Sequence, residues 1–295
     1  MRYAAHETLI VPARPSAQLW RLGLGVGIAV AAFLVMSFTY FNILAVIVTQ
    51  TEWPRFAAEI DAGSTPRGVL SVLGAFGLFT LALMLVMNQL HRRRLRTLLG
   101  PPGKAARDFL RVGIALTALA VLLWLLPEPG PMAPQPGLPP LRWAALLPLS
   151  LPLVFVQISA EELAFRGYLQ SQLAARFSHP LVWMAFPALL FGALHYDPAV
   201  AGPNAAAFVL AAFLFGLVTA DLTARSGTLG PALALHFANN LAALLITAPQ
   251  GHNFGLALQL YPFAMDDAAA RATWLPYDML TLLCAWLAAR LAIAR

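Results

Sequence analysis

Long apolar runs, separated by short charged segments, divide this chain from one end to the other. Runs such as residues 22–48 and 68–90 are long enough, as helices rising about 1.5 Å per residue, to cross about 30 Å of hydrocarbon. Only 11% of the 295 residues are charged, whereas soluble globular proteins contain about 25%. In lipid a helix satisfies its own backbone hydrogen bonds. The sequence therefore predicts an all-α, polytopic transmembrane helix bundle and an integral, multi-pass membrane protein.

The apolar runs predict about eight spans in three regions. The expected spans cover residues 22–48, 68–90, 112–126, 143–177, 181–195, 205–222, 231–247 and 275–293. Residues 1–142 form an N-terminal transmembrane region with spans one to three and a Pro-rich loop at 127–140. Residues 143–250 form a core with spans four to seven, and residues 251–295 form a loop and the last span. A polar loop is expected between spans one and two.

The distribution of basic residues orients the bundle. If the spans alternate sides, 15 of the 19 Arg and Lys residues lie on the side of both termini, many of them in the turn at 91–111. The positive-inside rule then places both termini in the cytoplasm. The basic surplus is thus a topology signal that implies contact with the lipid bilayer and its anionic headgroups, not with nucleic acid. The Ala-, Pro- and Arg-rich composition suggests a bacterial inner (plasma) membrane.

Two adjacent glutamates and an arginine lie in the fourth apolar run, at Glu161, Glu162 and Arg166. A charged residue near the bilayer centre costs about 2.5–3.5 kcal/mol on insertion scales, so such residues indicate function. Glu162 and Arg166 are four residues apart, acid first, and are expected to pair on one helix face. Glu161 is rotated by about 100° from Glu162, which leaves its carboxylate free. A salt-bridged kink or an interfacial helix end would explain the pair alone, but not the second glutamate.

Two of the six histidines fall in apolar spans. His195 closes the fifth span, and His236 shares a face of the seventh span with Asn240 at i, i+4. An interhelical hydrogen bond would explain either histidine or the amide alone. The remaining histidines lie in or beside extramembrane segments, where no special role is expected: His6, His91, His179 and His252. The single cysteine, Cys284, provides neither a disulfide framework nor a Cys-based metal site.

Together, the free carboxylate, the two histidines and the amide favour hydrolysis of a carbonyl compound inside the membrane. A carboxylate can take a proton from water, and a histidine can orient that water or protonate a leaving amine. An amide and a second histidine can donate hydrogen bonds to the oxyanion of a tetrahedral intermediate. The same groups, Glu161, His195 and His236, could instead bind a divalent metal such as zinc.

Three motifs carry a family resemblance. Glu161-Glu162-x-x-x-Arg166, Phe191-x-x-x-His195 and His236-x-x-x-Asn240, in this order, resemble the motifs of the CAAX protease and bacteriocin-processing family, of the abortive-infection type. This family includes the Ras-converting CAAX endopeptidase. The resemblance covers about residues 145–250. It implies that Glu161 activates water, His195 helps to hold it, His236 and Asn240 stabilise the oxyanion, and Glu162 and Arg166 are supporting residues.

The resemblance leaves the type of protease open. The family is commonly described as metalloproteases, and a glutamate-activated water without metal is the competing account. The chain has no His-Glu-x-x-His helix, so a metal site would have to be assembled across helices. His195 comes late in span five and Glu161 nearer the middle of span four, so their depths agree only if span five is tilted or starts below the hydrocarbon.

The leading hypothesis is therefore an intramembrane endopeptidase, a hydrolase that acts on a membrane-bound peptide or protein. Its substrate would be a prenylated CAAX-type protein or a leader peptide or bacteriocin precursor. A first alternative is a non-catalytic membrane immunity or scaffold protein, in which the polar residues serve helix packing. A second alternative is a proton-coupled transporter with Glu161 and the histidines as a proton relay. The absence of paired halves with matching broken helices argues against transport.

Overall fold

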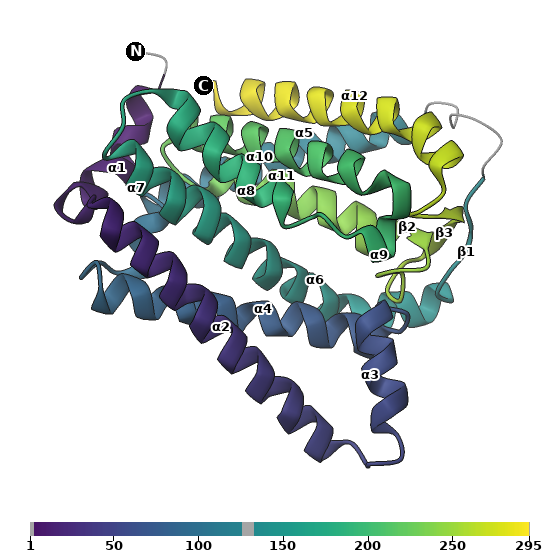
Figure 1. Ribbon diagram of the computed structural model, residues 1–295. Helices are drawn as coiled ribbons and strands as arrows, with labels where there is room; N and C mark the ends of the chain where they lie inside the picture. Colours follow the sequence, from purple (N-terminus) through teal and green to yellow (C-terminus); the bar gives the residue numbers. More distant parts are fainter. Residues whose placement is uncertain (1–2, 126–132, 295) are drawn as a thin grey trace.

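The computed structural model describes residues 3–125 and 133–294, and it confirms an all-α bundle (Figure 1). The chain begins with three short helical turns, at Ala4–His6 (η1), Glu7–Ile10 (α1) and Val11–Ser16 (η2). The long helices are α2 (Leu19–Ile47), α4 (Pro66–Gln89), α5 (Pro102–Trp124), α6 (Pro140–Glu162), α10 (Ala205–Ser226), α11 (Gly230–Leu241) and α12 (Ala268–Ile293). Shorter helices are α3 (Trp53–Ala62), η3 (Leu95–Leu98), α7 (Gln170–Ala174), α8 (Phe186–Ala193), α9 (Pro198–Ala201) and η6 (Gly202–Asn204).

A helix covers most of each of the eight expected spans in the residues that the structure describes, although residues at the ends of several spans, such as 175–177, 194–195 and 247, are not helical. Among the described residues, five helical segments are long and apolar enough to cross a membrane: Leu19–Ile47, Pro66–Gln89, Pro140–Ala174, Pro198–Ser226 and Ala268–Ile293. The helix of the expected third span, α5, is not one of them. Two shorter apolar helices, Leu181–Ala193 and Gly230–Ile246, correspond to the expected spans five and seven. Helix α5 starts at Pro102 rather than Val112, so its first half carries charged residues that were expected in the basic turn. The end of the expected third span, at residue 126, lies outside the described residues.

The expected polar loop between spans one and two contains a helix, α3. Its buried Glu59 accepts hydrogen bonds from Arg55 on α3, and from Thr65 and Arg67 at the start of α4. Gly63 ends the helix with φ +58°, a conformation that favours glycine. The Glu59 carboxylate thus joins α3 to the start of α4. This link explains why the polar segment forms a packed helix rather than an open loop.

A small sheet is the second departure from the expected helices. Strand β3 (Gln259–Ala264) lies between β1 (Gln135–Pro136), which is antiparallel to it, and β2 (Thr247–Gln250), which is parallel. The sheet lies at the end of the bundle opposite the N-terminal turns (Figure 1). Part of the Pro-rich loop thus pairs as a strand, while its first residues, 127–132, lie outside the described residues.

The N-terminal turns cover the other end of the bundle and bury two histidines that were expected to lie in or beside extramembrane segments. His6 is 1% exposed and packs against Trp183, with 4.9 Å between the ring centroids. His91 is 5% exposed and contacts Ser16 and Tyr168. Tyr168 approaches α2 at Gly25, where a Cβ atom would collide with the tyrosine hydroxyl and lie 3.0 Å from Val86. These contacts close the end of the bundle that the basic turn occupies.

A buried carboxylate on α5 anchors the turn that leads into α11. Asp108 is 3% exposed and accepts hydrogen bonds from Lys104, Ser226 and Thr228. The backbone N–H of Gly230, the first residue of α11, donates to the Thr228 hydroxyl. Helix α11 packs against α5, α6 and α10, so this anchor determines where its side chains meet those helices.

Candidate active site

The two adjacent glutamates lie where the central helix changes its winding. Helix α6 passes directly into a π-helical segment, η4 (Leu163–Leu169), and then into α7, so the fourth span is one helical segment of 35 residues. A π-helical turn is wider than an α-helical turn and often occurs at functional sites. The segment continues past Glu161 as far as Ala174, three residues short of the expected end at Phe177.

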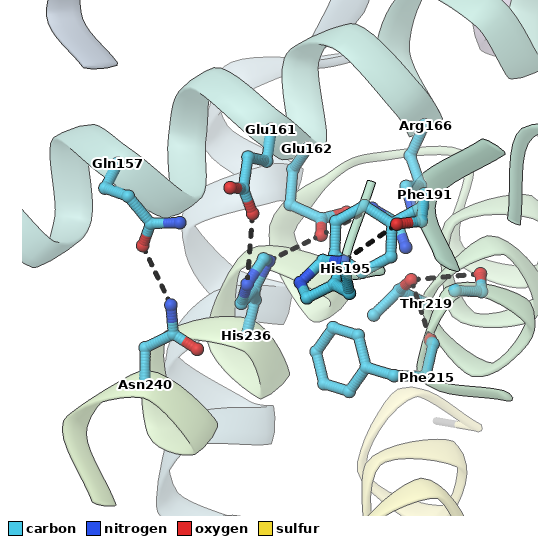
Figure 2. Close-up of polar contacts among 11 residues, drawn as sticks. Gln157, Glu161, Glu162, Arg166, Phe191, His195, Phe215, Thr219, His236 and Asn240 are labelled. Carbon is cyan, nitrogen blue, oxygen red and sulfur yellow. Dashed lines mark hydrogen bonds and ion pairs between the residues drawn. The ribbon is translucent and has the colours of Figure 1, made fainter. Parts of the chain in front are cut away.

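Glu162 is completely buried and connects two helices. Its Oε1 accepts hydrogen bonds from Nη1 of Arg166 at 3.0 Å and from Nδ1 of His236 at 2.8 Å (Figure 2). The Arg166 guanidinium also lies over the ring of Phe191, with 4.5 Å from Cζ to the ring centroid. The pairing of Glu162 with Arg166 that the helical spacing predicts is therefore present. The bond to His236 is an addition that spacing alone did not indicate.

This contact assigns the tautomer of His236. A carboxylate accepts hydrogen bonds, so Nδ1 of His236 carries the hydrogen and, in the neutral ring, Nε2 has a free lone pair. Nε2 lies 3.5 Å from Oε2 of Glu161. Nε2 of His236 and Oε2 of Glu161 both accept hydrogen bonds, so they attract each other only when a proton or another donor lies between them. Glu161 and His236 are thus placed to share a proton.

The two glutamates differ in exposure as well as in partners. The Glu161 side chain is 16% exposed, whereas that of Glu162 is 0% exposed. Glu162 already accepts hydrogen bonds from the Arg166 guanidinium and the His236 imidazole. Glu161 faces Nε2 of His236, at a distance too long for a strong hydrogen bond. Glu161 is therefore the carboxylate that a water molecule or a substrate can reach, as its rotation away from Arg166 predicted.

Asn240 has a partner that sequence reasoning missed. Its Nδ2 donates to Oε1 of Gln157 at 2.8 Å. Gln157 lies four residues before Glu161 on α6, and Asn240 lies four residues after His236 on α11. The two helices therefore face each other with two polar pairs about one turn apart (Figure 2). An amide four residues before Glu161, in an otherwise apolar run, was the available signal.

His195 lies just past the end of α8 and is exposed. Its Nδ1 is 2.8 Å from the carbonyl oxygen of Phe191 and donates to it, which leaves Nε2 as a free acceptor. The ring of Phe191 contacts His195 at 4.7 Å and His236 at 6.1 Å between centroids. The ring of Phe215, on α10, also contacts His236, with 5.0 Å between the ring centroids. The rings of Phe191 and Phe215 thus pack against the two histidines.

The structure joins the predicted residues to different degrees. Glu161, Glu162, Arg166 and His236 form one connected cluster, while no direct polar contact joins His195 or Asn240 to Glu161 among the described residues. The same residues contain no group of three or more His, Cys, Asp or Glu side chains that could hold a metal ion. Glu161 and His236 face each other as two of the three predicted ligands, and this donor set is incomplete for zinc.

Comparison with known proteins agrees with the motifs. Residues 142–242 match the family described as type II CAAX prenyl endopeptidase Rce1-like. An uncharacterised protein of Bacillus subtilis, YyaK, is 25% identical over 256 residues, which cover 84% of this chain and 85% of that protein. No solved structure gives a significant match. The resemblance that the three motifs indicated is thus confirmed over the segment that contains all of them.

Proposed function

We propose that the protein is an intramembrane endopeptidase that uses a glutamate-activated water, on the premise that residues 142–242 match the family described as type II CAAX prenyl endopeptidase Rce1-like. The observation that supports this most is the division of roles between the two adjacent glutamates. Glu162 is buried and bound to Arg166 and His236, whereas Glu161 is accessible and faces Nε2 of His236. One carboxylate is thus part of the scaffold, and the other is free for chemistry.

In the first step Glu161 acts as the general base. It takes a proton from a water molecule whose other hydrogen is held by Nε2 of His195, and the oxygen forms a bond to the carbonyl carbon of the scissile peptide. The carbonyl oxygen becomes an oxyanion. One N–H of Asn240 donates to Gln157, and its second N–H is left to stabilise that oxyanion.

In the second step the proton reaches the leaving amine through His236. Glu161 passes the proton to Nε2 of His236 across the 3.5 Å contact, and the imidazolium that forms is balanced by the Glu162 carboxylate. His236 can now donate from Nε2, first to the oxyanion and then to the amine nitrogen. The C–N bond breaks, the carboxyl product forms and His236 returns to its neutral tautomer.

The location of the site selects the kind of substrate. Glu161 and His236 lie on helical segments that are apolar along most of their length, so the peptide must enter or lie at the membrane. We propose a membrane-associated peptide or protein as the substrate, either prenylated near the cleaved bond, as the family description indicates, or carrying an apolar leader. The bilayer then holds the cleaved segment of the substrate at the membrane, where the active site lies.

The test compares Glu161→Gln with Glu162→Gln in purified full-length protein. A farnesylated CAAX peptide and a pool of leader peptides serve as substrates, and the metal content is measured on the same samples. We expect Glu161→Gln to keep the wild-type thermal stability and to lose at least about 100-fold in cleavage rate, since general base catalysis contributes roughly 10²–10⁴-fold. Glu162→Gln should lose both activity and stability, because Arg166 is then buried without its partner.

Glu52→Gln is the matched control, because Glu52 is exposed and lies outside the spans. It should cleave like the wild type. Wild-type cleavage by Glu161→Gln would overturn the proposed role of Glu161. If no substrate is cut and both active-site variants merely lose stability, the polar residues serve packing, as in an immunity or scaffold protein.

A further inference from the structure

The strongest unexplained feature outside the active site is a buried arginine without a partner. Arg93, in the turn after α4, is 8% exposed. Its Nε, Nη1 and Nη2 atoms are all buried and have no hydrogen-bond partner among the described residues. Burying an unpaired charge is costly, and a buried guanidinium is normally paired or hydrogen-bonded. A counter-ion that is not part of this chain would satisfy it.

The backbone is bent in a way that directs this side chain inward. Arg92 has φ +51°, in the left-handed region that non-glycine residues rarely adopt. The next N–H, that of Arg93, donates to the carbonyl oxygen of Met87 at 2.9 Å. Arg92 and Arg94 on either side are exposed. The chain therefore turns back on the end of α4 and buries one arginine of a basic run while its neighbours stay outside.

The surroundings of Arg93 are polar, and no acid among the described residues affects the pKa of its guanidinium. Gln172 donates to Nδ1 of His91 at 3.0 Å, so Nε2 of His91 carries the hydrogen and donates to the Tyr168 hydroxyl at 2.8 Å. Burial, together with the positive charges of Arg93 and Arg21, lowers the pKa of His91 to about 4, so this ring is neutral near pH 7. Burial also lowers the pKa of Arg93 to about 10, so its guanidinium is still charged near pH 7. The cluster is therefore cationic.

Arg21, on α2, carries a second guanidinium close enough to His91 to affect its pKa. The charges of Arg21 and Arg93 both act on His91, and the Nε atom of Arg21 is also buried without a partner in the described part of the chain. The residues that precede Arg21 line a groove together with the end of α7, formed by Arg14, Ala17, Gln18, Leu19, Trp20, Ala175 and Arg176. Leu19 and Trp20 are 49% and 61% exposed and offer an apolar surface beside the charges.

We propose that Arg93 and Arg21 bind the phosphate of an anionic phospholipid headgroup at the end of the bundle that holds the basic turn. Guanidinium groups bind phosphate oxygens through two parallel hydrogen bonds, and the three nitrogens of Arg93 have no partner among the described residues. Because these nitrogens are also covered, a headgroup reaches them by displacing the side chains around them. The exposed Leu19 and Trp20 favour a lipid over a free phosphate, because acyl chains can cover them. The site is separate from the glutamate–histidine cluster and does not depend on the proposed protease activity.

The experiment uses delipidated full-length protein in detergent. Thermal unfolding is recorded with phosphatidylglycerol, with phosphatidylcholine and with inorganic phosphate, and native mass spectrometry counts the bound lipids. We expect phosphatidylglycerol to raise the Tm of the wild type above its value in phosphatidylcholine. For Arg93→Gln, the Tm difference between the two lipids should be at most half of the wild-type difference. Native mass spectrometry should show one bound lipid fewer. Arg94→Gln, the control in the same exposed basic run, should keep both.

Two features separate a ligand site from a structural role. In phosphatidylcholine, Arg93→Gln should be no less stable than the wild type, because it removes a buried charge that has no partner in the chain. A lower Tm by the same amount in both lipids would overturn the proposal, and so would a wild-type response of Arg93→Gln to phosphatidylglycerol. An equal shift with inorganic phosphate would overturn the assignment to a lipid. If Arg93→Gln does not fold, Arg21→Gln must show the loss of the bound lipid in its place.

Discussion

One oxygen atom of Glu162 determines the chemistry available to its neighbours. By accepting from both Arg166 and His236, it fixes the orientation and the tautomer of the imidazole ring. In the neutral ring Nε2 cannot donate to an oxyanion. In the proposed mechanism, His236 therefore becomes an oxyanion donor only after it has taken the proton from Glu161. The family resemblance predicted a stabilising role for His236, and the geometry adds the order of events to that proposal.

At the same scale, Gln157 is predicted to orient Asn240. We expect Asn240→Ala to lower kcat by roughly 10²–10³-fold, the usual effect of removing one oxyanion donor. Gln157→Ala should lower kcat less, because it leaves the donor in place but removes the bond that holds it. The double variant should be no slower than Asn240→Ala alone, since residues that act as a unit are not additive. The measurement is the kinetics of all four proteins.

Independent effects would contradict this coupling. If the losses of the two single variants multiply in the double variant, Gln157 acts on catalysis by another route. Gln157→Glu provides the control, because a carboxylate can still accept from Asn240. Its kcat should lie closer to that of the wild type than the kcat of Gln157→Ala.

Among the helices, those that carry the motifs share a local irregularity. A π-helical segment follows Glu162 (η4), another precedes α8 (η5, Leu181–Ala185) and a third follows α11 (η7, Ala242–Ile246). Each lies within one or two turns of a motif. Such wide turns rotate the residues that follow them relative to a regular helix. Residue spacing still predicted the pairs that lie on one helix, because Glu162 and Arg166 are in direct contact.

The corner between α3 and α4 gives a prediction about pH. Hydrogen bonds from the Arg67 guanidinium, with help from Thr65, lower the pKa of the Glu59 carboxyl to about 2 from an ordinary value of 4.5. The folded state thus binds this proton less readily than the unfolded state. The stabilisation is fully present above about pH 4.5 and is lost as the pH falls toward 2.

Glu59→Gln should therefore be less stable than the wild type at pH 7 and should lose less stability between pH 5 and pH 3. Thermal unfolding across this range of pH is the measurement. Glu52→Gln, which removes an exposed carboxylate near the start of α3, should follow the wild-type curve. Parallel curves for Glu59→Gln and the wild type would show that Glu59 does not supply this pH dependence.

For the whole molecule, the structure places the basic turn and both chain ends at one end of the bundle, and the small sheet at the other (Figure 1). The basic turn and the positive-inside rule lead us to expect both termini in the cytoplasm. Reporter fusions at residues 1 and 295 should be active as cytoplasmic proteins, and an insertion after Thr49, between α2 and α3, should lie outside. A terminus found outside would reverse this orientation, and the Arg93 site would then face the outer leaflet.

Much of the fold and of the candidate site could be predicted without the structure. Helices were expected wherever long apolar runs occur, since lipid leaves the backbone few alternatives. The motif residues stood out because charged and amide side chains are rare in such runs, and Glu162 with Arg166 followed from helical spacing alone. The helix α3 and the strand β1 were missed, because each depends on a distant partner: Arg67 for the first and β3 for the second.

The sequence by itself determined which segments become helices and which polar groups must be satisfied inside the bundle, because both depend on composition and on spacing within one segment. The tertiary structure decided which groups meet. Glu162 binds His236, Gln157 binds Asn240, and His91 and Arg93 turn inward rather than toward solvent. The physical reason is that such contacts depend on the rotation and the ends of neighbouring helices. These are set by packing across the bundle and by anchors such as Asp108, far from the site in the chain.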